Sequence, residues 1–580
     1  MKKLTRRDFL KASAMGMGAV VVSTGLAGCI LDSDDKRSTV FTHGVASGDP
    51  LADGVVLWTR VVPDKDLEKA VSVAWEVATD RGFENLIHSG IAEARKAHDF
   101  TVKIDVRRLS PGQTYYYRFH TSDSESSVGT TLTLPEGSVD SVRLAVVSCA
   151  NYPAGYFNVY REISKRDDLD AVVHLGDYIY EYSSEAGSYA AADAAALGRT
   201  FPAENNLELI RLEDYRRRYG IYRGDSDLQT LHGKVPFIVV WDDHEVANDA
   251  WEDGADNHNA GEGDYGTRKL EALQAYFEWM PIRPVIEGND EAIFRTFQFG
   301  DLVALHMLDT RHMGRDEQLD YLDYFTANGL DQARFIADVG STNRTLLGAE
   351  QLLWLQASMG YSTATWQVLG QQILMGRMNL PAELLVKIAT EDFDGLPQQL
   401  GELALLKGRK LMSDPTLTDA ELARIETVAP YNLDAWDGYQ YEREVVLGTA
   451  KQLNKNLVVL AGDTHNAWAN NLKDLGGDQI GVEFATSSVS SPGLEDYLEL
   501  PEDLITGAEQ GIGILVDDLD YLNINQRGYM IVTFTIEAAR ADWYFVDTIK
   551  SRDYAIDTTR SASRMVRPGA GNRRVEPIAG

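Results

Sequence analysis

Four apolar runs in this 580-residue chain each end abruptly in side chains that bind metals. Three of them, residues 171–180, 237–245 and 457–465, end in Gly-Asp-Tyr-Ile-Tyr, Asp-Asp-His-Glu and Gly-Asp-Thr-His. The fourth, residues 144–149, ends in Cys149. Continuous Val, Ile and Leu runs are typical of buried parallel strands. Because the carboxyl ends of such strands meet where open α/β sheets bind ligands, the sequence predicts a metal site there.

The size and charge of the chain limit the kinds of protein it can be. A length of 580 residues exceeds what one hydrophobic core usually supports, so at least two domains are expected. Its net charge of −33 argues against non-specific binding to nucleic acid or anionic lipid, and no stable nucleic-acid partner is expected. Negatively charged substrates would need local cations to attract them, and a multivalent metal centre would supply these cations.

Residues 1–29 resemble an export signal. Thr5-Arg-Arg-Asp-Phe-Leu10 is a twin-arginine motif, and the following apolar segment, residues 12–26, is short and rich in Gly and Ala. Such a segment is too short to span a bilayer stably, which favours a processed signal over a transmembrane anchor. We therefore expect export by the twin-arginine (Tat) machinery to the periplasm or another extracytoplasmic location. The mature protein would be either membrane-tethered or secreted.

The two cysteines have separate explanations. Leu26-Ala-Gly-Cys29 resembles a lipobox in which Cys29 is acylated, although a chance cysteine near an ordinary cleavage site explains it equally well. A lipid on Cys29 is the only membrane contact expected. Cys149 would then be the only thiol left, so no intramolecular disulfide is expected. Because an unpaired thiol outside the cytoplasm needs protection, Cys149 is a candidate metal ligand.

The pattern of apolar runs predicts an α/β protein preceded by a small all-β domain. Residues 38–135 contain short alternating strands and turn signals, typical of an Ig-like or fibronectin-like β-sandwich. From 141 to 548, strands alternate with helical stretches, which is typical of a layered α/β domain. Within it, residues 381–428 are expected to form a helical insert. The tail, residues 549–580, is expected to be partly disordered.

Six side chains at the strand ends are candidate metal ligands. Asp177 follows Gly176, which allows a sharp turn, and its carboxylate could bridge two cations. Tyr180 lies three residues later, so its phenol could return to the same centre. Thiolate, phenolate and imidazole suit iron, whereas carboxylates suit Ca²⁺, Mg²⁺ or Mn²⁺. The candidates therefore divide into a softer set (Cys149, Tyr180 and His465) and a harder set (Asp243 and Asp463), and Asp177 could join both.

Each of these motifs also has a purely structural explanation. The tyrosines within residues 178–182 could pack in the core, and Asp242 or Asp243 could cap a helix. A cap accounts for one acid, but not for the run Asp-Asp-His-Glu at 242–245 followed by polar residues at 248–249. Acids so close together raise one another's pKa unless cations neutralise them. The run therefore favours a metal site.

Taken together, the motifs resemble a known family. Their order is similar to that of the binuclear metallophosphoesterases, which carry Asp, Gly-Asp-x-x-Tyr, Gly-Asn-His-Glu and Gly-His-x-His. This chain departs from that pattern at Cys149, Asp243 and Asp463, and these departures are typical of PhoD-like alkaline phosphatases. The resemblance covers about residues 40–548. It extends to Gly44-Val-Ala-Ser-Gly-Asp-Pro50, Leu57-Trp-Thr-Arg60, Asp434-Ala-Trp-Asp-Gly438 and Ser490-Ser-Pro-Gly493.

The resemblance implies a four-layer αββα sandwich of the metallophosphoesterase kind and a cofactor of Fe³⁺ and Ca²⁺. Fe³⁺ would be bound by Cys149, Asp177, Tyr180 and His465.

Calcium and catalytic roles also follow from the resemblance. Calcium would be bound by Asp177, Asp243 and Asp463. Asn248 would be a further ligand or a phosphate contact. His244 would contact the phosphoryl oxygens or assist the leaving group. The catalytic residues implied are therefore His244, Asp177 and Asn248.

The function implied is hydrolysis of small-molecule phosphate esters, for phosphate acquisition, by metal-hydroxide attack at a binuclear or trinuclear Fe–Ca centre. Metal binding lowers the pKa of water to about 7. A phosphodiesterase or phospholipase D-type activity at the same site is an alternative, because the metal site would look alike. A catalytically silent, metal-stabilised binding lipoprotein is a third hypothesis. The extra groups Asp243, His244 and His465 argue against it, since structural metal sites are usually closed.

Overall fold

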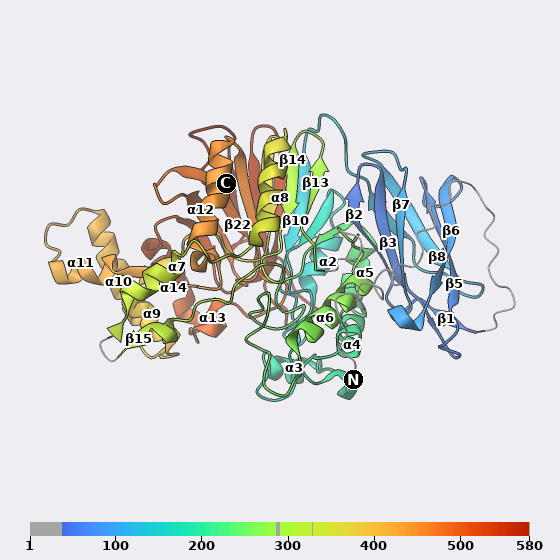
Figure 1. Cartoon of the computed structure of the whole chain (residues 1–580), viewed down its shortest axis with the longest axis horizontal. Coiled ribbons are helices and arrows are strands. Elements are labelled where there is room, and N and C mark those ends of the chain that lie inside the picture. Colours follow the sequence, from blue (N-terminus) through green and yellow to red (C-terminus); the bar gives the residue numbers. More distant parts are fainter. Residues whose placement is uncertain (1–36, 286–290, 327–328, 579–580) are drawn as a thin grey trace.

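The computed structural model describes residues 37–578 except 286–290 and 327–328, and it shows a mixed α/β fold with two large sheets (Figure 1). The predicted export signal with Cys29 lies outside the described residues. None of the helices in the described part combines the length and apolar character needed to cross a bilayer. The first large sheet has ten strands, in the spatial order β27 (Glu576–Pro577), β26 (Ala562–Val566), β25 (Ala539–Val546), β24 (Arg527–Phe534), β10 (Val142–Val147), β11 (Ala171–His174), β12 (Phe237–Val239), β2 (Val45–Leu51), β3 (Gly54–Arg60) and β7 (Thr101–Arg107). The second has seven, in the order β13 (Arg295–Phe299), β14 (Val303–Met307), β17 (Trp366–Gly370), β20 (Asn456–Ala461), β22 (Gln479–Ala485), β21 (Ala467–Lys473) and β23 (Leu519–Asn523).

The two large sheets pack against each other through alternate side chains of their strands. In β20, Val458 and Leu460 belong to the large core shared with strands of the first sheet. Their neighbours Leu457 and Val459 point the other way, into a core shared with helices α8 (Gly348–Tyr361) and α12 (Gln440–Gln452). This alternation is the period of two expected of a strand buried on both faces. The first sheet contacts helices as well, α2 (Asn158–Ser164), α4 (Leu212–Arg223), α5 (Ser226–His232) and α6 (Tyr265–Trp279).

The front part of the chain, residues 38–135, is continuous with the first sheet, because its strands β2, β3 and β7 belong to that sheet. The short strands expected within residues 38–135 are present, among them β3 at residues 54–60 and β7 at 101–107. Strand β2 pairs in parallel with β12 through Gly48 and Phe237. A Cβ on Gly48 would lie only 2.7 Å from the Phe237 carbonyl oxygen, so this contact requires glycine. A separate sheet packs on β3 and β7 with a core of its own, and its order is β6 (Leu86–Ala94), β5 (Val71–Ala78), β8 (Thr114–His120) and β9 (Gly129–Leu132).

Residues 381–428 are largely helical, as the sequence predicts. They contain α9 (Ala382–Ala389), α10 (Leu396–Leu411) and α11 (Asp419–Glu426), at the end of the molecule opposite the front part (Figure 1). Strands β18 (Asn379–Pro381) and β19 (Val428–Pro430) pair and close the segment. Helix α11 begins with a capping box between Thr418 and Glu421, which satisfies backbone N–H groups at its start. The remaining elements are α3 (Ala191–Leu197), α7 (Gln332–Val339), α13 (Leu494–Tyr497) and α14 (Ile505–Leu515), with the short pairs β1 (Thr39–Val40) and β4 (Val62–Pro63), and β15 (Phe325–Thr326) and β16 (Gly329–Leu330).

The C-terminal tail differs from the expected partial disorder. Strand β26 pairs with β25 and extends the first sheet. Beyond it, Asn456 Oδ1 of the second sheet accepts hydrogen bonds from Gly569 N (2.8 Å) and Arg573 Nε (3.0 Å). Val575 N donates to Asn471 Oδ1 at 2.9 Å. The content of Arg, Gly and Pro suggested disorder. The tail is ordered because it pairs with the edge of β25 and binds two asparagines that are distant in the sequence.

The buried histidine of β14 predicts a pH-dependent stability. His306 is fully buried, and its ring nitrogens lie 2.8 Å from Thr296 Oγ1 and 3.1 Å from Gln367 Oε1. Burial lowers the pKa of His306 to about 4, against about 6.5 for an exposed histidine. Between these values the unfolded chain binds a proton that the folded protein does not. The free energy of unfolding should therefore fall as the pH falls from about 6.5 to about 4, by about 1.4 kcal/mol per pH unit from this residue.

The variant His306→Gln should lack this contribution. Denaturant unfolding of both proteins across that pH window gives the slope of the free energy of unfolding against pH for each. The difference between the two slopes isolates His306, because the other titrating groups contribute equally to both. Equal slopes would contradict the prediction.

Candidate metal centre

The four strand ends identified in the sequence meet at one place. Strands β10, β11 and β12 are parallel neighbours in the first sheet, and β20 lies among parallel neighbours in the second. Two glycines allow the loops that follow these strands to approach closely. A Cβ on Gly176, whose φ is +103°, would lie 2.4 Å from Asp242 Cβ, and one on Gly462 would lie 2.8 Å from Ser148 Cβ. Any larger residue at either glycine would push these loops apart.

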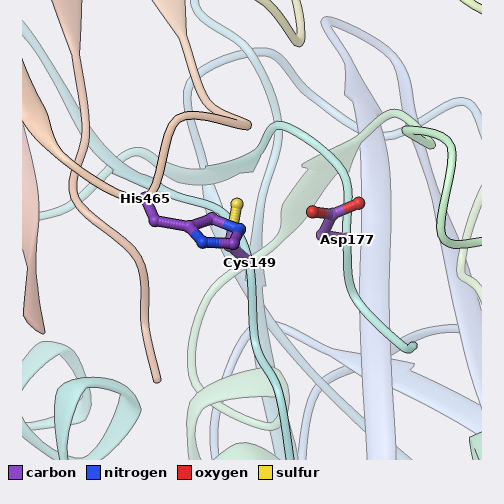
Figure 2. Close-up of side chains that lie close together, drawn as sticks. All are labelled: Cys149, Asp177 and His465. Carbon is purple, nitrogen blue, oxygen red and sulfur yellow. The ribbon is translucent and has the colours of Figure 1, made fainter. Parts of the chain in front are cut away.

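The softer candidate ligands are brought together in space. Ligand atoms of Cys149, Asp177 and His465 lie within 4.8 Å of one another, and Figure 2 shows the three side chains gathered from separate loops. Tyr180 joins them, since its hydroxyl donates to Asp177 Oδ2 at 3.0 Å and lies 3.2 Å from His465 Nε2. Ser491 Oγ donates to the same hydroxyl at 2.7 Å. The set predicted for iron therefore forms one cluster.

The harder candidates adjoin this cluster. Asp177, Asp243 and His244 form a second group with ligand atoms within 4.8 Å, and Asp242, Asp243 and Asp463 form a third. Asp177 thus belongs both to the softer cluster and to a group with Asp243, which is the position of a bridging carboxylate. Asp463 shares a group with Asp243 but not with Asp177.

Backbone strain is concentrated at the same residues. Cys149, Asp177, Asp463 and His465 all have left-handed backbones, with φ of 60°, 54°, 60° and 61°. This region is sparsely populated by residues other than glycine, and such strain clusters at functional sites, where the surrounding structure enforces it. Four of the six predicted metal ligands are therefore held in unfavourable conformations.

The electrostatics of the cluster call for added positive charge. Burial, assisted by neighbouring acids, raises the pKa of Cys149 and of Asp177 well above their usual values, and raises that of Asp463 to about 7. Burial lowers the pKa of His465 to about 3, so its ring is neutral. His465 Nδ1 lies 2.5 Å from the Pro492 carbonyl oxygen, to which it donates, and this leaves the lone pair on Nε2. The thiol and carboxyl groups cannot all ionise here unless cations neutralise them.

Unpartnered buried oxygens also fit a metal centre. Within the described part of the chain, Asp177 Oδ1, Asp242 Oδ2 and Asp243 Oδ1 are buried and have no hydrogen-bond partner. Buried carboxylate oxygens are normally satisfied, and hard cations bind such oxygens. The adjoining thiol, phenol and imidazole are ligands that suit iron. The donor set therefore fits the iron and calcium that the sequence resemblance implies.

His244 is positioned by an acid that the predicted site did not include. Its ring lies over that of Tyr180, with centroids 4.2 Å apart, and its Nδ1 is 2.7 Å from Glu181 Oε2. Although burial opposes its charge, Asp243 and Glu181 raise the pKa of His244 well above its usual value. Asn248, the third predicted catalytic residue, is half-buried, and its backbone N–H donates to Glu181 Oε1 at 2.8 Å. Glu181 follows Tyr180 directly, and only the fold reveals its contact with His244.

Glu245 ties two ligand-bearing loops together. Its buried carboxylate accepts the backbone N–H groups of Asp177 (3.0 Å), Tyr178 (2.6 Å) and Asp242 (2.7 Å). One side chain therefore holds the loops that follow β11 and β12 in register.

Arg311 is a further residue that sequence reasoning missed. It is fully buried after β14, and its guanidinium donates to Asp242 Oδ1 (2.5 Å), Asp434 Oδ1 (2.8 Å) and Asp463 Oδ1 (3.1 Å). The signal that marks the other strand ends is present here, in Asp309-Thr-Arg-His312 after an apolar strand. It was missed because arginine is not a metal ligand.

Comparison with known proteins assigns the family. A family model described as "PhoD-like phosphatase" matches residues 144–543, and its N-terminal-domain model matches residues 27–135. The chain belongs to the PhoD-like phosphatase family. It is 33% identical to "Alkaline phosphatase D" of Bacillus subtilis (strain 168), over 96% of this chain and 87% of that protein. A solved structure described as "Structure of PhoD" matches with a TM-score of 0.72 and 32% identity, covering 93% of this chain and 92% of that one. The resemblance found in the sequence is thus confirmed, and with it the prediction of a phosphoric ester hydrolase of the PhoD type.

Replacing Glu245 by glutamine should loosen the site. The amide would turn a donor toward a backbone N–H, so at least one buried donor would lose its acceptor, at a cost of about 1–3 kcal/mol. Because the ligand-bearing loops then shift, metal content should fall as well. Denaturant unfolding and mass-spectrometric metal analysis measure the two effects.

Glu483→Gln is the matched control. Glu483 is also buried and accepts backbone N–H groups, from Met375 (2.5 Å) and Gly376 (2.9 Å), but it contacts none of the candidate ligands. This variant should lose stability and keep its metal. A Glu245→Gln protein with full metal content would show that Glu245 does not position the ligands.

Proposed function

We propose that this protein is an exported alkaline phosphatase that hydrolyses small-molecule phosphate esters at a centre of Fe³⁺ and Ca²⁺, for phosphate acquisition. The observation that carries the proposal is the convergence of Cys149, Tyr180 and His465 around Asp177, next to Asp243. A thiol, a phenol and an imidazole suit ferric iron, and the adjoining carboxylates suit calcium. The matched relative named "Alkaline phosphatase D" supports phosphate esters as substrates.

The arrangement of layers supports the finer description of the fold. Helices α8 and α12 pack on the outer face of the second sheet, and the two large sheets share one core. This order supports a four-layer αββα sandwich of the metallophosphoesterase kind. The front part, with two packed sheets and its own core, supports an Ig-like or fibronectin-like unit in front of it.

In the reaction, side chains of this protein would position the ester and transfer one proton. Fe³⁺ would be held by Cys149, Asp177, Tyr180 and His465, and Ca²⁺ by Asp177, Asp243 and Asp463. When bound, the metals would supply charge neutralisation at the phosphoryl oxygens and a lowered pKa for the attacking water.

His244 has the charge and the partner that a proton donor needs. Glu181 occupies its Nδ1, so Nε2 is the nitrogen left to donate to a phosphoryl oxygen or to the leaving oxygen. Burial opposes a charge on the ring, but Asp243 and Glu181 together raise the pKa of His244 well above its usual value. Asn248, held to the same Glu181 through its backbone, would lie beside His244 as a further phosphate contact or calcium ligand.

Export and tethering are supported by the N-terminal motifs alone. The twin-arginine motif supports passage through the Tat machinery to an extracytoplasmic location, and the lipobox supports a lipid on Cys29.

Buried Cys149 has no disulfide partner among the described residues, which is the state expected of a thiol reserved for a metal.

Asp177→Asn should remove metal and activity together. A neutral amide cannot bridge two cations. The loss should exceed about 100-fold in kcat/KM, because removing a group that merely hydrogen-bonds to a metal ligand already costs about 10–100-fold. Metal analysis and assays on an aryl phosphate monoester and a diester measure both effects, and the wild-type ratio shows which ester class is preferred.

Asp168→Asn is the matched control for this substitution. Asp168 lies in the same part of the chain but pairs with Arg143 and Arg166 at the surface. It should keep metal and activity. Turnover retained by Asp177→Asn would refute the proposed function.

Tyr180→Phe should abolish a visible charge-transfer band. A phenolate bound to Fe³⁺ absorbs visible light, and phenylalanine cannot provide that bond. Tyr178→Phe is the control, because the Tyr178 hydroxyl contacts His232 in the core (2.8 Å) and should not affect the band. Absorption spectra of the three proteins, normalised to iron content, decide whether Tyr180 is an iron ligand; an unchanged band in Tyr180→Phe would exclude it.

A further inference from the structure

Arg311 faces several carboxylates beside the proposed metal centre. Its three nitrogens face three different aspartates, Asp242, Asp434 and Asp463. Its Nη2 also lies 3.6 Å from Asp243 Oδ1. The guanidinium is fully buried, and so are Asp242 and Asp243. A fixed positive charge therefore stands within the group of acids that the fold offers to a hard cation.

The loop that carries Arg311 is built to hold it there. Asp309 Oδ1 accepts the backbone N–H groups of Arg311 (2.8 Å) and His312 (3.0 Å). Arg315 donates to the Asp434 carbonyl oxygen at 2.8 Å and to its carboxylate. Asp309 thus fixes the backbone that carries Arg311, and Arg315 fixes Asp434, one of the aspartates that Arg311 contacts. These contacts hold the guanidinium in one position.

We propose that Arg311 is a built-in cation that takes the place of a divalent ion between Asp242 and Asp463, and thereby sets how many divalent ions this chain binds. The inference rests on the proposed Fe³⁺–Ca²⁺ function and concerns the harder half of that centre. Arg311 is a positioning residue, because each of its nitrogens already donates to a carboxylate of the protein.

The unpartnered oxygens indicate where a divalent ion is left to bind. Asp177 Oδ1, Asp243 Oδ1 and Asp242 Oδ2 have no hydrogen-bond partner among the described residues, but the guanidinium of Arg311 already occupies the space between Asp242 and Asp463. Asp177 and Asp243 also belong to one candidate group. Arg311 therefore directs calcium to the Asp177–Asp243 side, next to the softer ligands, where two metals could share Asp177. Asp463 gives only Oδ1 to Arg311, so its other oxygen could still bind that calcium.

Replacing Arg311 tests the proposal through metal content. Arg311→Met removes the charge with little loss of volume, and the uncompensated acids should then bind one additional divalent ion per chain, with calcium affinity at least tenfold higher at that position. Arg311→Lys keeps the charge and should match the wild type. The measurement is calcium and iron per chain after equilibrium dialysis against calcium, with folding checked by circular dichroism.

Iron content separates this proposal from the function it rests on. Iron should stay unchanged in both variants, because Arg311 contacts none of Cys149, Tyr180 and His465. Wild-type protein without metal would refute the proposed function, and the role of Arg311 with it. Wild-type protein with iron and calcium, together with an Arg311→Met variant that gains no divalent ion, would refute only the Arg311 proposal.

The wild-type protein provides a second test that does not depend on the folding of a variant. In crystals in which Mn²⁺ replaces calcium, anomalous scattering should place manganese beside Asp177 and Asp243. An anomalous peak between Asp242 and Asp463 would overturn the proposal.

Discussion

The repulsion among buried acids is the constraint on which the rest of the site depends. Asp177, Asp242, Asp243 and Asp463 lie together at the ends of strands from two sheets, and the first three are buried while Asp463 is half-buried. At such sites neighbouring carboxyl groups raise one another's pKa, and cations bind strongly among them. The protein places the guanidinium of Arg311 among these acids, and the remaining unpartnered oxygens fit metal ions. The fit of the site to metal ions and the proposed reaction both follow from this shortage of positive charge.

The scaffold holds these groups in place by close backbone contacts. Gly176 allows the loops after β11 and β12 to touch, Gly462 allows the loop after β20 to touch the first sheet at Ser148, and Glu245 accepts backbone N–H groups from the loops after β11 and β12. The left-handed backbones of Cys149 and Asp177 are maintained by this framework. A site assembled in this way can be rigid before any metal binds, which is the arrangement that favours catalysis over simple metal storage.

The elements of the fold were more predictable than their connections. The front strands and the helical residues 381–428 agree with the apolar patterns, because burial on one or both faces leaves a local periodicity. The pairing of β2 with β12 and the docking of the tail on β25 could not be predicted in this way. Both depend on partners that are distant in the sequence.

The sequence by itself determined the types of ligand and the strand ends from which they project, because each apolar run and the polar residues after it are adjacent in the chain. It also identified the family through the departures at Cys149, Asp243 and Asp463. Only the tertiary structure decided which side chains meet, since Arg311, Asp434 and Glu181 act through contacts across the fold. A local pattern indicates which side chains of one segment are buried. The balance of charge at a site depends on side chains from several segments, which come together only in the folded protein.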